Sequence, residues 1–203
     1  MNETGTDNSG LYAQGRISIA ADRLRDLGLD EATVELLSRQ GLPRLAEAHG
    51  LLGLAFDEPF LLRLGDQGTA VAIARETWAP DLYVAISPRS GHVVAVSGKP
   101  GGETTFINSS AGQFLAFLSH ALEFFSRASK DADSPTTMTL AQARERLVAL
   151  RRGDIRPKAA TVSFDRQKEA ARLRQVFKET DPAALVSETW WDRVLEQIDD
   201  GQI

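Results

Sequence analysis

The sequence contains no cysteine among its 203 residues. This absence excludes a disulfide framework, a thiolate zinc site and a cysteine nucleophile. Histidine is scarce as well: His49, His92 and His120 are scattered along the chain and form no His-x-x-x-His pair. Because proteins hold zinc with clustered histidine, cysteine and carboxylate ligands, we expect neither a metal site nor a cofactor.

Long apolar runs are also missing, since none approaches the ~20 residues that a membrane-spanning helix needs. The N-terminus, MNETGTDNSG, is polar and acidic, whereas a secretory signal begins with basic residues and an apolar stretch. We therefore expect a cytoplasmic protein with no membrane partner. Residues 1–14 are expected to form a disordered tail, because little in them favours ordering, and residues 15–203 a single domain.

The net charge of −5 is unevenly distributed. Residues 136–178 carry 11 basic and 4 acidic side chains, whereas residues 179–203 carry 7 acidic and 1 basic. The cations at 144–158 either form a solvated helix face that pairs with acidic C-terminal residues or contact phosphates. No aromatic residue interleaves with them and the chain is acidic overall, so direct nucleic-acid binding is not expected. A nucleic-acid-associated regulatory or adaptor module using residues 144–178 remains the alternative function.

Short apolar and β-branched runs, typical of strands, dominate the middle of the chain. They read PFLLRLGD, TAVAIARE, DLYVAIS, HVVAVSG and ETTFIN. The link Pro88-Arg89-Ser90-Gly91 is typical of a hairpin turn, and the V-V-A-V run after it is apolar on both faces, as in a central strand. Short links indicate antiparallel pairing. We predict an α+β fold with a central antiparallel sheet of about four to six strands flanked by helices.

Helix signals flank these runs. Asp30 is a good N-cap for a helix that ends at Gly41, with Pro43 following. Phe114 and Phe117 begin an apolar stripe at helical spacing, which predicts a long helix lying across the sheet. Asp181-Pro182 predicts the start of a last helix that carries two adjacent tryptophans.

The stretch Asn108-Ser109-Ser110 is either a nucleophile on a sharp turn or the start of that long helix. The G-x-S-x-G elbow of hydrolases is absent, and no histidine has the context of a base. A cap needs only local residues: Ser110 accepts from the Gln113 amide, and the Gln113 side chain returns to the Ser110 N–H. Asn108 is expected to bond backbone groups at the strand exit. We predict a structural role and no enzyme activity.

Several segments, taken in order, resemble the fourth subfamily of the SUKH superfamily of bacterial immunity proteins. They are GLP at 41–43, LRLGDQG at 62–68, YVAISPRSGHVVAV at 83–96, FINSSAGQFLAFL at 106–118, and DPAAL with WWDRVLEQIDDG at the C-terminal end. Residues 134–164, with an extra basic helix, depart from the pattern and are interpreted as an insertion or linker within a single SUKH-like domain.

The resemblance implies an antitoxin that binds a cognate polymorphic toxin, often a nuclease or a nucleic-acid deaminase, inside the producing cell. Such toxins tend to be basic where they bind substrate, so acidic side chains are candidate contacts. The candidates are Asp57, Glu58, Asp66 and Asp81, for which turn chemistry or plain surface charge is the alternative.

Trp190 and Trp191 point about 100° apart on a helix, so one is expected in the core and the other partly exposed. We assign Trp190 to the core and Trp191 to the partner surface, because tryptophan dominates binding hot spots.

Overall fold

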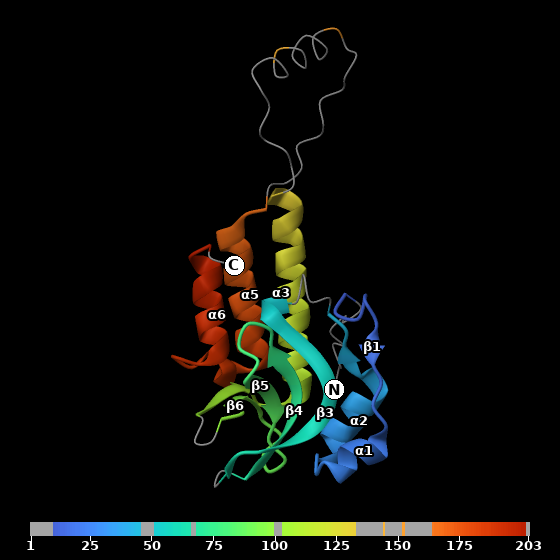
Figure 1. Ribbon diagram of the computed structural model, residues 1–203. Coiled ribbons are helices and arrows are strands. Elements are labelled where there is room, and N and C mark those ends of the chain that lie inside the picture. Colours follow the sequence, from blue (N-terminus) through green and yellow to red (C-terminus); the bar gives the residue numbers. More distant parts are fainter. Residues whose placement is uncertain are drawn as a thin grey trace.

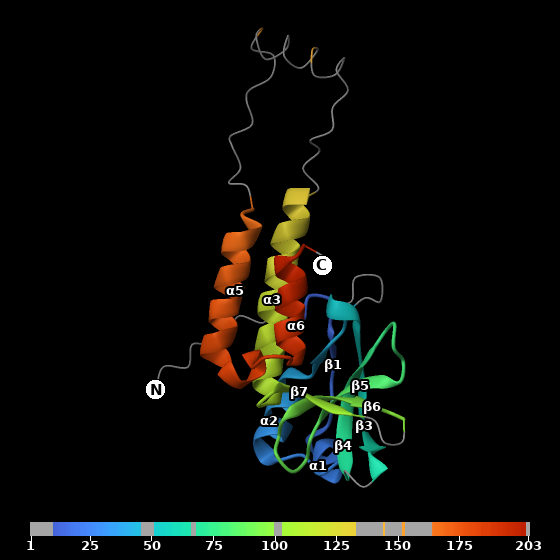
Figure 2. The same cartoon turned by 90° about the vertical axis from the view of Figure 1, so that its left-hand side faces the viewer.

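The computed structural model describes residues 10–45, 51–65, 68–99, 103–132, 144, 152 and 164–201 (Figure 1). Helices α3, α5 and α6 lie side by side, and α1 and α2 pack against each other near the N-terminal end of α3 (Figures 1 and 2). The helical elements are α1 (Ala21–Asp26), α2 (Glu31–Gln40), η2 (Leu51–Gly53), α3 (Ala111–Ala132), α5 (Arg166–Thr180), η4 (Pro182–Leu185) and α6 (Trp190–Asp199).

The main sheet has five antiparallel strands in the order β3-β4-β5-β6-β7. They are β3 (Leu54–Arg63), β4 (Thr69–Glu76), β5 (Leu82–Ile86), β6 (Val93–Ser97) and β7 (Thr104–Asn108). The α+β class and the strand number are therefore confirmed. The β5–β6 hairpin is also confirmed, and both of its strands lie inside the sheet, with β3 and β7 at the edges.

Helix α3 supplies much of the core, as its apolar stripe predicts. Phe114 and Phe117 are fully buried, and the Phe117 ring stacks on Phe177 of α5 with 3.9 Å between ring centroids. Burying an aromatic side chain of this size stabilises a fold by about 1.5–3 kcal/mol. The aromatic stripe thus fixes α5 beside α3.

The N-terminal region is more ordered than predicted, so the expected tail to Gln14 is too long. Leu11 is 1% exposed, and the Tyr12 hydroxyl donates to the Gly41 carbonyl at 3.2 Å. A second, two-stranded sheet pairs β1 (Arg16–Ile17) with β2 (Leu42–Pro43) in antiparallel register. Two-residue strands carry no periodicity, which is why the sequence did not predict them.

Gly41 joins α2 to β2 in a conformation that favours glycine. Its φ is 74°, and a Cβ at this position would lie 2.5 Å from the Ile17 carbonyl oxygen. Glycine therefore lets the chain turn sharply after the helix and bring Pro43 opposite Arg16. At the other end of α2, Asp30 Oδ1 accepts the Thr33 N–H at 3.0 Å, as expected of an N-cap.

The predicted helix from Pro182 onward is wrong. The chain forms only the short 3-10 helix η4 there, Glu188 has a φ of 69°, and α6 begins at Trp190. The Asp181 side chain does not cap η4. Its carboxylate is hydrogen-bonded elsewhere, as described below.

The predicted insertion at 134–164 falls almost entirely outside the described residues. Arg144 and Arg152 are described as exposed helical residues, without the segment around them. Phe164 is described, and its ring packs against Phe124 of α3 with 5.3 Å between centroids. The described chain therefore rejoins the core at Phe164.

Candidate functional site

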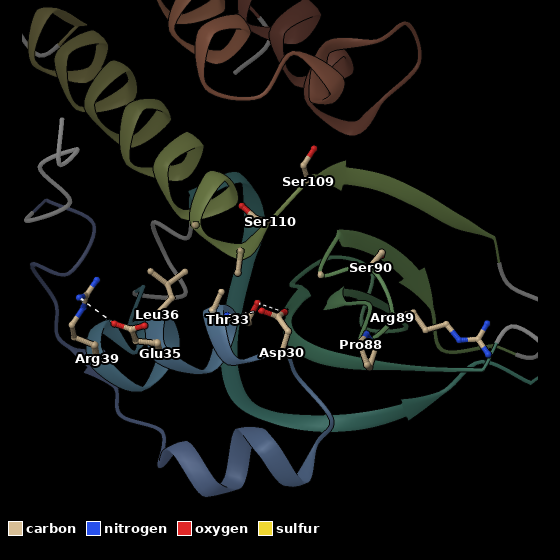
Figure 3. A pocket seen from close by; sticks show the side chains of 14 residues that line it. Asp30, Thr33, Glu35, Leu36, Arg39, Pro88, Arg89, Ser90, Ser109 and Ser110 are labelled. Carbon is tan, nitrogen blue, oxygen red and sulfur yellow. Dashed lines mark hydrogen bonds and ion pairs between the residues drawn. The ribbon is translucent and has the colours of Figure 1, made fainter. Parts of the chain in front are cut away.

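Ser109 and Ser110 lie between β7 and α3, beside a hollow lined by one side of α2, the N-terminal end of α3 and the β5–β6 turn (Figure 3). Ser110 Oγ accepts the Gln113 N–H at 3.3 Å and therefore caps α3. The reciprocal half of the predicted capping box is wrong. The Gln113 side chain accepts from the Ser110 hydroxyl at 2.8 Å, and its Nε2 donates to the Thr180 carbonyl at 2.9 Å. The cap thus also joins α3 to the end of α5.

Asp181 is the centre of a buried hydrogen-bond network and is only 2% exposed. Its Oδ2 accepts from Asn108 Nδ2 at 3.1 Å and from the Ser109 N–H at 2.7 Å. Its Oδ1 accepts from the Ser109 hydroxyl at 2.9 Å. Trp191 Nε1 completes the network by donating to Asn108 Oδ1 at 2.8 Å. The expectation that the Asn108 side chain bonds backbone groups is wrong, because its hydrogen bonds are made with the side chains of Asp181 and Trp191.

These contacts give both serines structural roles. Ser109 points toward the C-terminal segment (Figure 3), where its hydroxyl donates to Asp181. A serine nucleophile needs a base that removes its proton, and neither described histidine, His92 or His120, lines the hollow. Burial lowers the pKa of His120, with Glu123 opposing the shift. The arrangement anchors β7 to the C-terminal helices.

Removing the Ser110 hydroxyl tests the cap. Ser110→Ala should lower the free energy of unfolding by about 1 kcal/mol, because one helix N–H loses its acceptor. Urea denaturation measures the change, with the exposed Ser187→Ala as a control that should leave stability unaltered. A Ser110→Ala protein as stable as the wild type would contradict the capping role.

The candidate acidic contacts lie on different elements, and two of them form ion pairs. Asp57 and Glu58 lie inside β3, where its register shifts. Asp57 pairs with Arg75 at 3.1 Å. Asp81 pairs with Lys99 at 3.3 Å. Asp66 falls outside the described residues.

The two adjacent tryptophans have the opposite places from those assigned. Trp191 is fully buried against Phe117 and Phe177, with ring centroids 5.2 and 5.0 Å away. A side chain with no exposed surface cannot contact a partner, so the assignment of Trp191 to a partner surface is wrong. Trp190 is the partly exposed member, and its ring meets Trp191 edge-on.

Trp190 lines a second hollow, of about 720 Å³, which we call the tryptophan groove. Its lining residues are Leu52, Glu76, Trp78, Leu82, Ala95, Ser97, Glu103, Thr105, Trp190, Arg193, Val194 and Gln197. They come from η2, strands β4 to β7, the β4–β5 turn and α6. Trp78, in the turn, is 70% exposed. The sequence pattern did not predict this site, although it contains a tryptophan in a proline-containing turn (T-W-A-P-D).

Glu76 lies between the two groove tryptophans. Burial raises the pKa of this carboxyl, while side-chain hydrogen bonds from Trp78 and Trp190 oppose the shift. The carboxylate is therefore partly withdrawn from water beside the two indoles. Such a carboxylate attracts a cation more strongly than one on an open surface, because solvent screens it less.

The family model described as SUKH-4 immunity protein matches residues 9–197. The chain belongs to the SUKH-4 immunity protein family. The match extends N-terminal to the segments that carried the resemblance and includes Leu11 and both strands of the small sheet. Among curated proteins and among solved structures, none matches this SUKH-4 protein.

Membership of the SUKH-4 family supports an immunity role and implies a cognate toxin as partner. Immunity proteins of this family are generally not enzymes. In the part of the chain that the structure describes, no helix is long and apolar enough to cross a bilayer. Within the same residues, no group of three or more histidine, aspartate or glutamate side chains is placed to hold a metal ion.

Proposed function

We propose that this SUKH-4 protein neutralises its cognate toxin by binding directly to it, and that the toxin acts on nucleic acid. The family match over residues 9–197 carries the first part. The contacts of Ser109 and Ser110 support it as well, because the one sequence feature that suggested catalysis is used to hold the fold together.

The distribution of charge supports the second part. The chain is acidic overall, and residues 179–203 alone carry 7 acidic side chains against 1 basic. Asp57, Glu58 and Asp81 are exposed on the sheet and its turns. A toxin that binds nucleic acid presents a basic surface, so an acidic protein is steered toward it and competes with phosphate there.

The alternative, nucleic-acid binding through residues 144–178, has less support in the described part of that segment. Arg174 of α5 pairs with Asp199 at 2.8 Å and with Asp192 at 3.8 Å, both on α6. Glu169 of α5 pairs with Arg127 of α3 at 2.6 Å. The Arg174 pairs support the interpretation in which cations of this segment pair with the acidic C-terminal helix. The Glu169 pair joins α5 to α3.

Expression of the cognate toxin, sought among the genes beside this one, tests the proposal. Cells that produce the toxin alone should die with their DNA or RNA cleaved or deaminated. Cells that also produce this protein should survive with intact nucleic acid, and a catalytically inactive toxin should still co-purify with it. The inactive toxin is the matched control, since it separates binding from toxicity.

Two results would contradict different parts of the proposed function. Neither rescue nor co-purification would overturn neutralisation by binding. Rescue from a toxin that leaves nucleic acid untouched would overturn only the nucleic-acid part.

A further inference from the structure

The tryptophan groove is built to hold its exposed indole in place. Gly53 has a φ of 67°, and a Cβ there would lie 2.0 Å from Cη2 of Trp78. Only glycine therefore lets this indole rest against the backbone of η2. The Thr77 N–H donates to the Gly53 carbonyl at 2.7 Å, which ties the turn to the same point. Trp78 is thus exposed and yet fixed.

The opposite wall of the groove is fixed through the core. Trp190 packs against Trp191 with 4.6 Å between ring centroids and an interplanar angle of 89°. Trp191 is held in turn by its hydrogen bond to Asn108. Both indoles are therefore ordered before any partner arrives, and an ordered aromatic side chain loses little entropy on binding.

Glu76 lies between these walls, and no ion pair shown among the described residues includes it. The interactions that shift its pKa are burial and the two indole hydrogen bonds, and no charged group of the described residues is among them. Its neighbours in the groove include Glu103 and one basic residue, Arg193, which is exposed on α6. The lining thus has two carboxylates against one cation, which attracts a positive group and repels phosphate.

We propose that the tryptophan groove receives an arginine side chain of the cognate toxin. The guanidinium lies against the indoles of Trp78 and Trp190 and pairs with the Glu76 carboxylate. This inference rests on the proposed function, because it names the chemistry by which the toxin is recognised.

Arginine fits this lining better than the other cationic or stackable groups. Its planar guanidinium stacks on indole faces, is weakly hydrated and pairs with a carboxylate in a bidentate manner. The lysine ammonium is strongly hydrated and cannot stack in this way. Nucleic-acid bases also stack on tryptophan, but their phosphates would meet Glu76 and Glu103. A protein partner is therefore favoured.

Affinity measurements with an inactive form of the toxin that this protein neutralises test the inference. Trp78→Ala and Glu76→Gln should each weaken binding about 30-fold, as expected of hot-spot residues. The matched controls are Phe60→Ala, an exposed aromatic on β3 outside the groove, and Glu196→Gln, an exposed carboxylate on α6 outside the groove. Both should change the affinity less than about threefold.

A double-mutant cycle identifies the occupant. One toxin arginine, changed to lysine, should weaken binding to the wild type but have little further effect on Glu76→Gln, because both changes remove the same pair. Thermal unfolding of each variant confirms that it is folded, and Trp78→Phe replaces Trp78→Ala if that variant is not.

The outcomes separate the inference from the proposed function. Toxin bound equally well by wild type, Trp78→Ala and Glu76→Gln would overturn the groove while leaving neutralisation by binding intact. Coupling of Glu76 to a toxin lysine, or to no toxin residue, would also overturn the arginine assignment. A wild-type protein that does not bind the toxin would overturn both.

Discussion

Trp191→Ala should lower the free energy of unfolding by about 3–5 kcal/mol, the usual cost of deleting a large buried aromatic side chain. The indole is fully buried against Phe117 and Phe177, so its loss leaves a cavity where three helices meet. It also removes the only donor shown for Asn108 Oδ1 among the described residues. Chemical denaturation followed by circular dichroism measures the loss, because it does not depend on tryptophan fluorescence.

The neighbouring tryptophan is the natural control. Trp190→Ala should cost about 1 kcal/mol, since this side chain is partly exposed and leaves a cavity open to solvent. Trp191→Phe keeps one aromatic ring but removes the Nε1–H donor to Asn108 and part of the buried volume, so its cost should lie between those of the two alanine variants. Equal destabilisation by Trp190→Ala and Trp191→Ala would contradict the division between a core tryptophan and a surface one.

Asp181→Ala should destabilise the protein by about 3 kcal/mol, because it leaves one buried and one half-buried donor without their acceptor. Those donors are Asn108 Nδ2 and the Ser109 N–H, which lie 3.1 and 2.7 Å from the lost Oδ2. Urea denaturation measures the effect. Asp200→Ala, at an exposed position, removes the same charge from the same end of the chain and should change stability little.

A second readout ties Asp181 to the C-terminal helices. Hydrogen exchange in α5 and α6 should accelerate in Asp181→Ala, because the network joins their connecting segment to β7. Destabilisation no greater than that of Asp200→Ala would show that the network contributes nothing beyond its charge.

The features that sequence could predict have local signals. Asp30 caps the start of α2 and Gly41 follows its end, so both signals lie next to the helix that they delimit. The β5–β6 hairpin is encoded by its turn, and α3 by the apolar spacing of one continuous stretch. Each of these needs only neighbouring residues to be recognised.

The features that sequence missed depend on partners far away in the chain. Asn108 bonds Asp181 and Trp191, which are 73 and 83 residues away. The sequence predicts that Asp181 caps a helix. In the structure its carboxylate instead accepts hydrogen bonds from Asn108 and Ser109 at the end of β7. The reversed assignment of the two tryptophans is different, because local spacing does predict which of them is buried. Trp191, Val194, Leu195 and Ile198 are spaced i, i+3, i+4 and i+7 and form the buried face of α6.

The tryptophan groove shows the same limit. Trp78, Glu76 and Trp190 are brought together by a turn, a strand and a helix, and nothing in their spacing predicts it. By contrast, the family motif F-I-N-S-S could be read from sequence, and its polar residues hold the C-terminal helices on β7. That anchoring places Trp190 beside the sheet, so a structural motif positions the proposed binding surface.

Titration of the toxin's activity with this protein tests neutralisation by binding most directly. A binder predicts that activity falls in proportion to the protein added, reaches full inhibition at a fixed molar ratio and does not change with incubation time. Full inhibition by far less protein than toxin, growing with time, would instead indicate a catalyst. Undiminished toxin activity in the presence of excess protein would contradict the immunity role itself.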